Sequence, residues 1–527
     1  MVLRRLIQKA RPGRLRHFLK DTSGNMAIVV AISALPLMMA GGAAVDYGNW
    51  VSVEARLQAA VDAAALAVGR EINKTDDELE IIALNYFRAN FGEPRNTGTP
   101  EVTLSLDNAK VRVDATVDVD NYLMKAVGKD SQVVSTYAEV SKEATNLDVV
   151  LVFDNTGSMA QEQRLSTLKV AANDFVEILF GPNATASTLQ VGVVPFSQFV
   201  NVGPQNANQA WIDKDGLNEL SRANFKGAGW HNWSAWQNVT RLSRKHTWAG
   251  CVEARAGSLS VSDTTPTFAI PETLFPPAFA PDEPGFVAEN QSCYGSDGKK
   301  QDCGWSTQHR YYNTYMTDTG ADGDLDDMQR DARKYRRNPA HPASRGPNQG
   351  CNIQPIQPLT NVKAPVLATI KAMKADGYTH VAEGVGWGLR VLSPGEPFTE
   401  GRPYSKETTK AMVLLTDGEN TFDDQSNHNL STYTAYGYLA QERLGTRNYW
   451  TGVKKQNSLL QEACNNVKAE DIVVYSFAYN VKSATQQGLI RKCASDPEKY
   501  FDPPSNEALV QNFQQIADEL RRLHLSK

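Results

Sequence analysis

The chain has 527 residues, of which 41% are hydrophobic and 21% charged, so its length exceeds one ordinary domain and its composition excludes a wholly disordered protein. Seven of its 54 Lys and Arg residues lie in the first 20 positions, where there is no acid, which leaves 47 basic against 59 acidic residues in the remainder. An acidic body of this kind argues against nucleic acid as a partner.

The amino-terminal region predicts a basic cytoplasmic tail, residues 1–25, followed by a transmembrane helix, residues 26–45. No charged residue occurs between Asp21 and Asp46, and a helix of about twenty residues is about 30 Å long, the thickness of a bilayer core. Basic residues on the amino side keep that end in the cytoplasm. We therefore expect a single-pass protein of a bacterial inner membrane, its bulk periplasmic or surface-exposed. A cleaved signal peptide is the alternative, disfavoured because the apolar segment is longer than usual.

Residues 46–72 predict a juxtamembrane amphipathic helix with one apolar stripe. Its apolar residues recur at helical spacing, at Val53, Leu57, Val61, Ala64, Val68 and Ile72. Such a stripe is buried against another element. Two partners are open: the stripe packs on its own domain, or it packs on a helix of another protein.

Several motifs of this region occur together in one known family. Gly24-Asn25-Met26 precedes the apolar segment, Val45-Asp46-Tyr47-Gly48 follows it, and Leu57–Ala67 is Ala-rich and helical. With the basic tail, these motifs resemble the amino-terminal region of the TadE/TadG-like proteins of tight adherence (Tad, Flp) pilus assembly. The resemblance implies a membrane-anchored pilus assembly factor.

Residues 73–145 predict a small β-rich spacer. Val102, Leu104 and Leu106 alternate with polar residues, and after a turn signal at 107–109 the alternation resumes from Val111 to Val119. Alternation with a period of two predicts a hairpin, and residues 132–140 supply a third strand. The expected role is to hold the following domain away from the membrane.

A buried strand ends in a loop rich in oxygen ligands. The run 147–153 is apolar and β-branched and predicts a strand covered on both faces, as in a parallel sheet. Asp154, Thr156 and Ser158 follow at its carboxyl end, which is where open α/β sheets bind ligands. One carboxylate and two hydroxyls within five residues suit a hard cation such as Mg²⁺. The plainer interpretation is that Asp154 caps a helix.

Two later segments supply further oxygen ligands. Thr379 stands at the entry of an apolar-periodic helix, and Asp417 ends a second buried-strand pattern, residues 411–416. These three loops resemble the metal-ion-dependent adhesion site of von Willebrand factor A (vWA) domains, with Thr156 where the family usually has Ser. The match consists of Asp154, Thr156, Ser158, Thr379 and Asp417.

The vWA resemblance implies a fold and a function. The fold is α/β, a doubly wound and mostly parallel sheet over residues 146–527, with a final helix at 506–523 and a long irregular insertion at about 200–360. Together with the amino-terminal motifs it resembles TadG-like proteins. The implied function is not enzymatic: Mg²⁺ or another divalent cation is held one ligand short and binds a carboxylate of a protein partner, such as a pilin or another subunit of the pilus or secretion machinery.

Two rival functions use the same chain. Asp154-Asn155-Thr156-Gly157-Ser158 is close to the phosphorylation loop of P-type ATPases and haloacid-dehalogenase-like phosphotransferases, in which Asp154 would be the nucleophile. That family requires a second carboxylate where this chain has Thr156, so its general acid is missing. A purely structural envelope tether with an unused metal site is the other alternative.

The insertion is rich in aromatic residues. It holds six of the nine tryptophans, at Trp211, Trp230, Trp233, Trp236, Trp248 and Trp305. These rings predict the core of an irregular subdomain, with a sugar- or peptide-binding face as the alternative. The run 318–327 contains five Asp residues and predicts a solvated acidic loop, with a Ca²⁺ site as the alternative.

The six cysteines predict disulfides in an exported region. Cys464 and Cys493 flank a predicted strand at 472–477 and are expected to pair. Four more lie in the insertion, and their three possible pairings stay open: Cys251, Cys293, Cys303 and Cys351.

Overall fold

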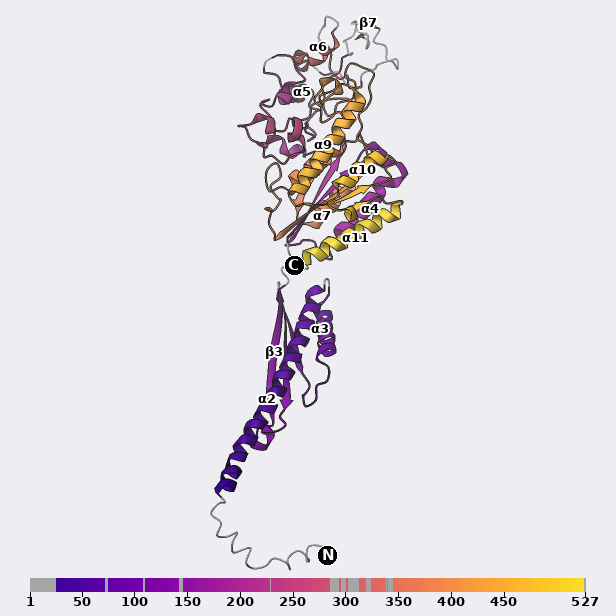
Figure 1. The fold of residues 1–527 in the computed structure, drawn as a ribbon. Coiled ribbons are helices and arrows are strands. Elements are labelled where there is room, and N and C mark those ends of the chain that lie inside the picture. The colour runs from indigo at the N-terminus through magenta and orange to yellow at the C-terminus, as the bar shows by residue number, and fades with distance from the viewer. Residues whose placement is uncertain are drawn as a thin grey trace, which may run out of the picture. The chain divides into compact units, whose positions relative to one another are not determined.

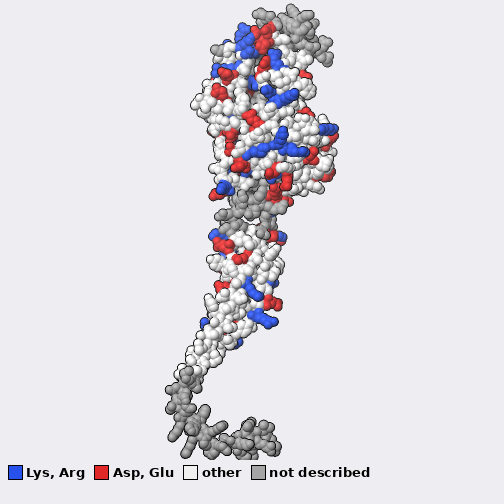
Figure 2. Space-filling view, in the orientation of Figure 1, with Lys and Arg blue, Asp and Glu red and all other residues white. Residues whose placement is uncertain are grey.

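The computed structural model forms two compact units, Met1–Ala144 with Leu525–Lys527, and Thr145–His524. Figure 1 shows the elements of both, and Figure 2 shows where charged side chains lie on one face of each. The structure describes residues 25–71, 74–107, 110–141, 146–227, 229–284, 293–294, 300–301, 312–318, 324–337, 339 and 345–525. The predicted cytoplasmic tail lies almost wholly outside the described residues, as do Cys303 and Trp305.

One helix, α2 (Asn25–Arg70), covers both the predicted transmembrane segment and the predicted amphipathic segment. The α-helical assignment is continuous through Pro36. By length and composition alone, the part from Val29 to Gly69 is long and apolar enough to cross a membrane. The sequence pattern placed a boundary at Asp46 because the charge begins there, but the backbone has no break at that position.

The amino-terminal unit combines α2 with a three-stranded antiparallel sheet of β1 (Glu101–Asp107), β2 (Lys110–Asp120) and β3 (Ser131–Ser141) in the order β1-β2-β3. Alternate residues of β2, from Val111 to Val119, are buried as the period of two predicts. The stripe of α2, from Val53 to Val68, lies in the same core. The described part of the stripe therefore packs on its own domain.

A helix that the sequence pattern did not predict completes this unit. It is α3 (Asp76–Phe91), which begins with a capping box between Thr75 and Glu78 and buries Phe87 against α2. Asp46 ties α2 to the end of β2: its carboxylate accepts the backbone N–H groups of Tyr122, Leu123 and Met124 at 2.7–3.0 Å. Three such bonds compensate a carboxylate that is fully buried.

The second unit is built on a six-stranded sheet in the order β11-β10-β9-β4-β5-β8. Its strands are β4 (Asn146–Asp154), β5 (Leu189–Phe196), β8 (Gln357–Thr360), β9 (Thr408–Thr416), β10 (Val473–Ala478) and β11 (Tyr500–Phe501). All neighbours are parallel except β8, which pairs antiparallel with β5. The chain order reverses between β4 and β9, and at such switch points open α/β sheets bind ligands.

Helices cover both faces of this sheet. On one face α4 (Arg164–Phe180), α7 (Lys363–Ala372) and α11 (Asn506–Leu525) share a core with Leu151 and Phe153 of β4. On the other face α8 (Val381–Leu392), α9 (Tyr449–Ala469) and α10 (Ala484–Cys493) share a core with Val150 and Val152. Burial on two faces explains why β4 is a continuous apolar run. The doubly wound α/β prediction is confirmed.

The insertion occupies residues 197–356, between β5 and β8. Its described elements include α5 (Asn232–Ser243), α6 (Leu325–Arg330) and the short strands β6 (Cys293–Tyr294) and β7 (Lys300–Gln301). Trp211, Trp236 and Trp248 are buried in the same core as Val150 and Val152. The core interpretation is confirmed for these rings, but this core is continuous with one face of the sheet, so the insertion does not form a separate subdomain.

A second irregular segment, residues 419–448, lies between β9 and α9. Tyr433 and Tyr438 of this segment are buried in a cluster with Phe199 and Cys251 from the insertion. No sequence pattern predicts this segment, because polar residues surround its aromatic ones. Its aromatic residues pack against the insertion and so connect the insertion to the carboxyl end of β9.

Two disulfides join described residues. Cys464 of α9 is bonded to Cys493 of α10, as predicted. Cys251 is bonded to Cys351, which resolves one of the pairs that the sequence left open.

Candidate metal centre

The carboxyl ends of β4 and β9 bring the two predicted carboxylates to one edge of the sheet. The strands are parallel neighbours with Phe153 opposite Leu415, so Asp154 and Asp417 emerge on the same side. Both side chains are buried, and Asp154 is fully so. Parallel pairing alone explains how residues so far apart in the chain become neighbours.

Hydroxyl groups connect the two carboxylates. Ser158 Oγ donates to Asp417 Oδ1 at 2.6 Å, and Ser158 Oγ lies 3.0 Å from Thr156 Oγ1. Asp154 Oδ1 accepts the backbone N–H of Thr156 at 2.8 Å. Its Oδ2 accepts the hydroxyl of Thr416 at 2.6 Å. Four of the five predicted ligands therefore form one connected cluster.

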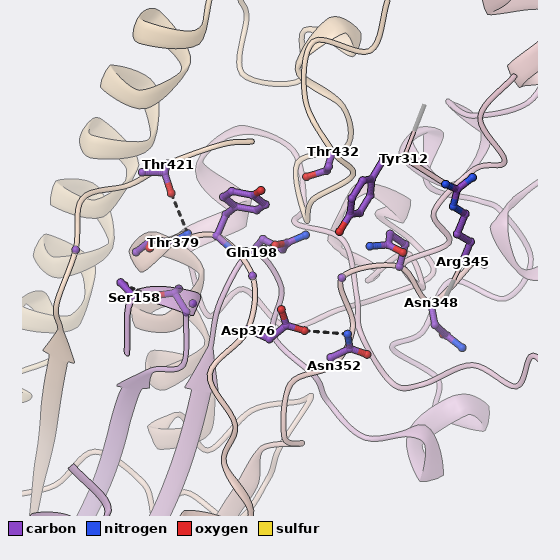
Figure 3. A pocket seen from close by; sticks show the side chains of 18 of the residues that line it. Ser158, Gln198, Tyr312, Arg345, Asn348, Asn352, Asp376, Thr379, Thr421 and Thr432 are labelled. Atoms are coloured by element: carbon purple, nitrogen blue, oxygen red, sulfur yellow. Dashed lines mark hydrogen bonds between the residues drawn. The ribbon is translucent and has the colours of Figure 1, made fainter. Parts of the chain in front are cut away.

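Thr379 reaches the same cluster from the loop before α8. The N–H of Gly157 donates to the carbonyl of Gly377 at 3.0 Å, and the N–H of Thr421 donates to the carbonyl of Thr379 at 3.0 Å. A methyl group placed on Gly418 would lie 3.6 Å from Thr379 Oγ1 and 3.8 Å from Ser158 Oγ. The structure thus brings together all five residues, and Figure 3 shows Ser158 and Thr379 side by side.

The surroundings of Asp154 stabilise its negative charge only in part. Burial and, next, the charge of Asp417 raise the pKa of Asp154 to about 7, against the opposing hydrogen bonds from Thr156 and Thr416. Its contacts are a backbone N–H and hydroxyls, with no basic side chain among the described residues that hydrogen-bond it. A cation beside Asp154 would offset this charge.

Arg164 compensates the second carboxylate, and the sequence analysis missed this role. Its guanidinium donates to Asp417 Oδ2 at 2.8 Å and to Glu162 Oε2 at 2.8 Å. The Arg164 side chain is 9% exposed. Arg164 begins α4. Its position ten residues after Asp154 is the one sequence signal for this role. That spacing predicts no contact with Asp417 unless the path of the intervening turn is known.

The hydroxyl ligands face a large cavity. It has a volume of about 1230 Å³, and Thr156, Ser158 and Thr379 line it, whereas Asp154 and Asp417 do not. The insertion supplies the basic residues Lys245 and Arg345 to its wall. Figure 3 shows Arg345 at the other end of the cavity from Ser158. Of these residues Ser158 is partly exposed, whereas Thr156 and Thr379 are buried like the two carboxylates.

The residues present fit a hard divalent cation. Two carboxylates and three hydroxyls form an all-oxygen donor set, which Mg²⁺ prefers and which soft metals do not. Among the described residues no three His, Cys, Asp or Glu side chains cluster as a metal site. A transition-metal centre built from such side chains therefore finds no support in the described part of the chain.

Fold and site together define a doubly wound α/β domain that resembles vWA domains. Residues 24–71 match the Tad family model, described as "Putative Flp pilus-assembly TadE/G-like", so the amino-terminal resemblance to TadE/TadG-like proteins is confirmed over that range. No curated protein matches the chain.

Solved structures of vWA domains and pilus proteins are similar to the chain. They include the pilus adhesin SpaC from Lactobacillus rhamnosus GG, with 11% identity over 81% of this chain and 34% of SpaC and a TM-score of 0.29. The vWF domain of the type V pili tip protein Mfa5 from Porphyromonas gingivalis has 9% identity over 73% of this chain and 97% of that domain, TM-score 0.33. A von Willebrand factor type A protein from Catenulispora acidiphila has 9% identity over 81% and 50%, TM-score 0.27. The chain thus spans about a third of the length of SpaC.

Proposed function

We propose that this chain is a membrane-anchored pilus assembly or adhesion factor that holds a divalent cation at Asp154, Thr156, Ser158, Thr379 and Asp417 and uses it to bind a carboxylate of a protein partner. The observation that carries the proposal is the convergence of three distant loops at the switch point of the sheet. The anchor would be α2, and the family match at residues 24–71 supports the pilus context.

The hydroxyls and the carboxylates would have different tasks. Thr156, Ser158 and Thr379 line the cavity and would ligate the ion on the side open to a partner. Asp154 and Asp417 lie behind them and would supply negative charge, directly or through water. Mg²⁺ would supply a Lewis-acidic position that attracts an anionic oxygen. Because Arg164 neutralises part of the charge of Asp417, the ion would keep more of its attraction for a carboxylate.

The opposite wall of the cavity suits an anionic partner. Lys245 is exposed, and Arg345 shares the same cavity with the three hydroxyls. Two acidic residues also line it, but Asp376 is engaged by the amide of Asn352 at 2.9 Å. A partner segment with one carboxylate at the ion and further negative charge toward Arg345 would satisfy both ends of the cavity.

The placement of Asp154 argues against the phosphotransferase alternative. A nucleophile must reach its substrate, but Asp154 is fully buried, does not line the cavity, and has both oxygens engaged in hydrogen bonds. The non-enzymatic function is therefore preferred. Incubation with a phosphoryl donor should leave no hydroxylamine-labile label on Asp154, and such a label would favour the enzyme.

Titration calorimetry of the full chain in detergent, with Mg²⁺ added to chelator-treated protein, tests the proposal. Asp154→Ala should abolish the binding signal and should also abolish Mg²⁺-dependent recovery of partners in a crosslinking pull-down. Asp376→Asn is the matched control, because it removes an exposed carboxylate from the same cavity but not from the ligand set. If chelation and Asp154→Ala change nothing, the structural tether is the better description.

A further inference from the structure

A second buried charge cluster lies in the insertion. Lys334, in the short helix η9 (Ala332–Arg336), lies between Asp282 and Asp318. Its Nζ is 2.6 Å from Asp282 Oδ2 and 3.3 Å from Asp318 Oδ1. The three side chains are 0–2% exposed. Asp318 is thus buried in an ion pair, which corrects the prediction of a solvated acidic loop at this residue. Among the described residues of the run 318–327, no three acidic side chains cluster as a metal site.

Aromatic and apolar residues surround this cluster. Tyr315, Met316 and Tyr335 belong to the same hydrophobic core as Val150 and Val152 of β4 and are fully buried. Tyr335 Oη accepts the backbone N–H of Asp282 at 2.9 Å, and the Tyr315 hydroxyl donates to the carbonyl of Ala280 at 2.8 Å. An amine and a carboxyl group are therefore held in contact in a medium from which water is largely excluded.

The two oxygens of Asp282 have different surroundings. Oδ1 accepts two backbone N–H groups, from Tyr315 at 2.5 Å and from Met316 at 2.6 Å. Oδ2 faces Lys334 Nζ. Two amides on one oxygen stabilise negative charge there, as in an oxyanion hole, and so polarise the carboxyl carbon toward a nucleophile. The oxygen on the lysine side is then the one free to leave.

Lys334 and Asp282 rest as an ion pair, and the condensation starts from its minor neutral form. Burial raises the pKa of Asp282 to about 7, although Lys334 opposes this shift. Burial by itself lowers the pKa of Lys334, but the charges of Asp282 and Asp318 raise it above its usual value. In a medium of low dielectric, transfer of one proton from Nζ to Oδ2 converts the ion pair into an amine and a carboxylic acid.

We propose that Lys334 and Asp282 condense to an intramolecular amide bond, with Asp318 as the proton carrier. After the first proton passes from Nζ to Oδ2, the amine lone pair attacks Cγ of Asp282. Asp318 takes a second proton from Nζ and delivers it to Oδ2, which leaves as water. The C–N bond forms, the C–Oδ2 bond breaks, and the third ammonium proton remains on the amide, so no oxidant or other co-reactant is needed.

The bond would crosslink two parts of the insertion. It would connect residues 282 and 334 and close the segment between them, which contains Cys293 and Cys303. A covalent link would keep residues 282 and 334 together under a pulling force that breaks the hydrogen bonds of this aromatic core. This inference does not depend on the metal-site proposal, because the two clusters share no residue.

The chain contains a matched pair that should not react. Lys410 Nζ lies 3.1 Å from Asp148 Oδ2, and both side chains are buried. Here, however, Arg402 also binds the carboxylate, with its guanidinium at Oδ1 and its backbone N–H at Oδ2. Arg402 thus contacts both oxygens of Asp148, and no second carboxylate stands beside Lys410 among its described partners.

Peptide mass spectrometry of the full chain, denatured, reduced and digested with trypsin, tests the proposal. The expected result is a joined pair of peptides containing Asp282 and Lys334, lighter by one water than their sum, with no cleavage after Lys334. Cleavage after Lys410 should be normal. Recovery of Lys334 as an unmodified, cleaved residue in the wild-type chain would overturn the proposal.

Two variants separate chemistry from folding. Lys334→Arg keeps a buried cation but lacks the nucleophilic amine, and it should give no joined peptides. Asp318→Asn keeps hydrogen-bonding capacity but removes the proton carrier, and it should leave Lys334 mostly unlinked while the Cys251–Cys351 disulfide still forms. Complete linkage in folded Asp318→Asn protein would overturn the role assigned to Asp318.

Discussion

The edge of the sheet and the insertion place buried carboxylates in opposite situations. At the sheet edge Asp154 lies among hydroxyls and amides with no basic side chain bonded to it, beside a cavity of about 1230 Å³. In the insertion Asp282 lies against a lysine inside an aromatic core. Both have a pKa of about 7. The comparison teaches that a raised pKa arises in two ways: at the sheet edge no basic side chain among the described residues bonds to Asp154, and in the insertion burial outweighs the adjacent lysine.

The largest expected effect on the free energy of unfolding comes from removing a disulfide, and it should be larger for the bond in the insertion than for the bond between α9 and α10. In the chain-entropy account a loop of about 100 residues contributes about 4.7 kcal/mol and a loop of about 15 residues about 3 kcal/mol. Cys251–Cys351 spans 100 residues and Cys464–Cys493 spans 29. Replacing Cys251 and Cys351 by Ala should therefore lower the free energy of unfolding more than replacing Cys464 and Cys493, as measured by denaturant unfolding. Equal losses would mean that the insertion is held mainly by its packing.

The pH dependence of stability should report the two carboxylates separately. A carboxyl group whose pKa is raised on folding binds more protons in the folded state, so stability falls as pH rises from about 4 to about 7, by up to about 4 kcal/mol for one group. In metal-free protein Asp154→Asn should flatten this slope, and added Mg²⁺ should do the same. Unfolding midpoints measured across this pH range check it.

The same pH experiment also tests whether Asp282 is joined to Lys334 or is a free carboxyl group. If Asp282 is joined to Lys334 it no longer titrates, and the slope left in Asp154→Asn protein comes from other buried carboxyl groups such as Glu283 and Glu383, whose pKa values burial also raises. If Asp282 remains a free carboxyl group with a pKa of about 7, a second slope of the same sign survives in Asp154→Asn protein.

Thr416→Val should have an intermediate effect. The substitution keeps the shape of the side chain but removes the hydroxyl that donates to Asp154 Oδ2 at 2.6 Å. An unsatisfied buried carboxylate oxygen should cost about 1–3 kcal/mol in the free energy of unfolding. Saturating Mg²⁺ should recover part of that loss if the ion neutralises Asp154. A loss that is identical with and without Mg²⁺ would contradict the metal site.

Arg164→Gln gives the smallest expected effect. It removes the guanidinium from Asp417 Oδ2 and leaves more negative charge for the ion, so Mg²⁺ affinity should rise by a few-fold, about 1 kcal/mol for a partly buried pair. Glu162→Gln is the control, because it changes the exposed partner of Arg164 and not Asp417. Calorimetric titration measures both, and weaker binding in Arg164→Gln would mean that Arg164 chiefly positions Asp417.

Local patterns were sufficient for most of the regular part of the molecule, although they missed α3. The strand at 146–154, the alternation of β2, the helix entry after Thr379 and the pairing of Cys464 with Cys493 follow from periodicity, composition and spacing. Regular elements are predictable because each repeats one backbone geometry and buries one face. The convergence of Asp154 with Asp417 could be anticipated for the same reason, since parallel strands end at one edge.

Contacts between distant irregular segments were not predictable. Arg164 finds Asp417 only after η4 (Gly157–Gln163) turns the chain, and Lys334 finds Asp282 only when the insertion folds around its aromatic rings. The segment 419–448 likewise becomes core through Tyr433 and Tyr438. The sequence by itself determined the sheet, the edge of the sheet that carries Asp154 and Asp417, and the apolar amino-terminal helix. Only the tertiary structure decided which buried charges are paired, because a side chain's partner depends on loop paths that no local periodicity encodes.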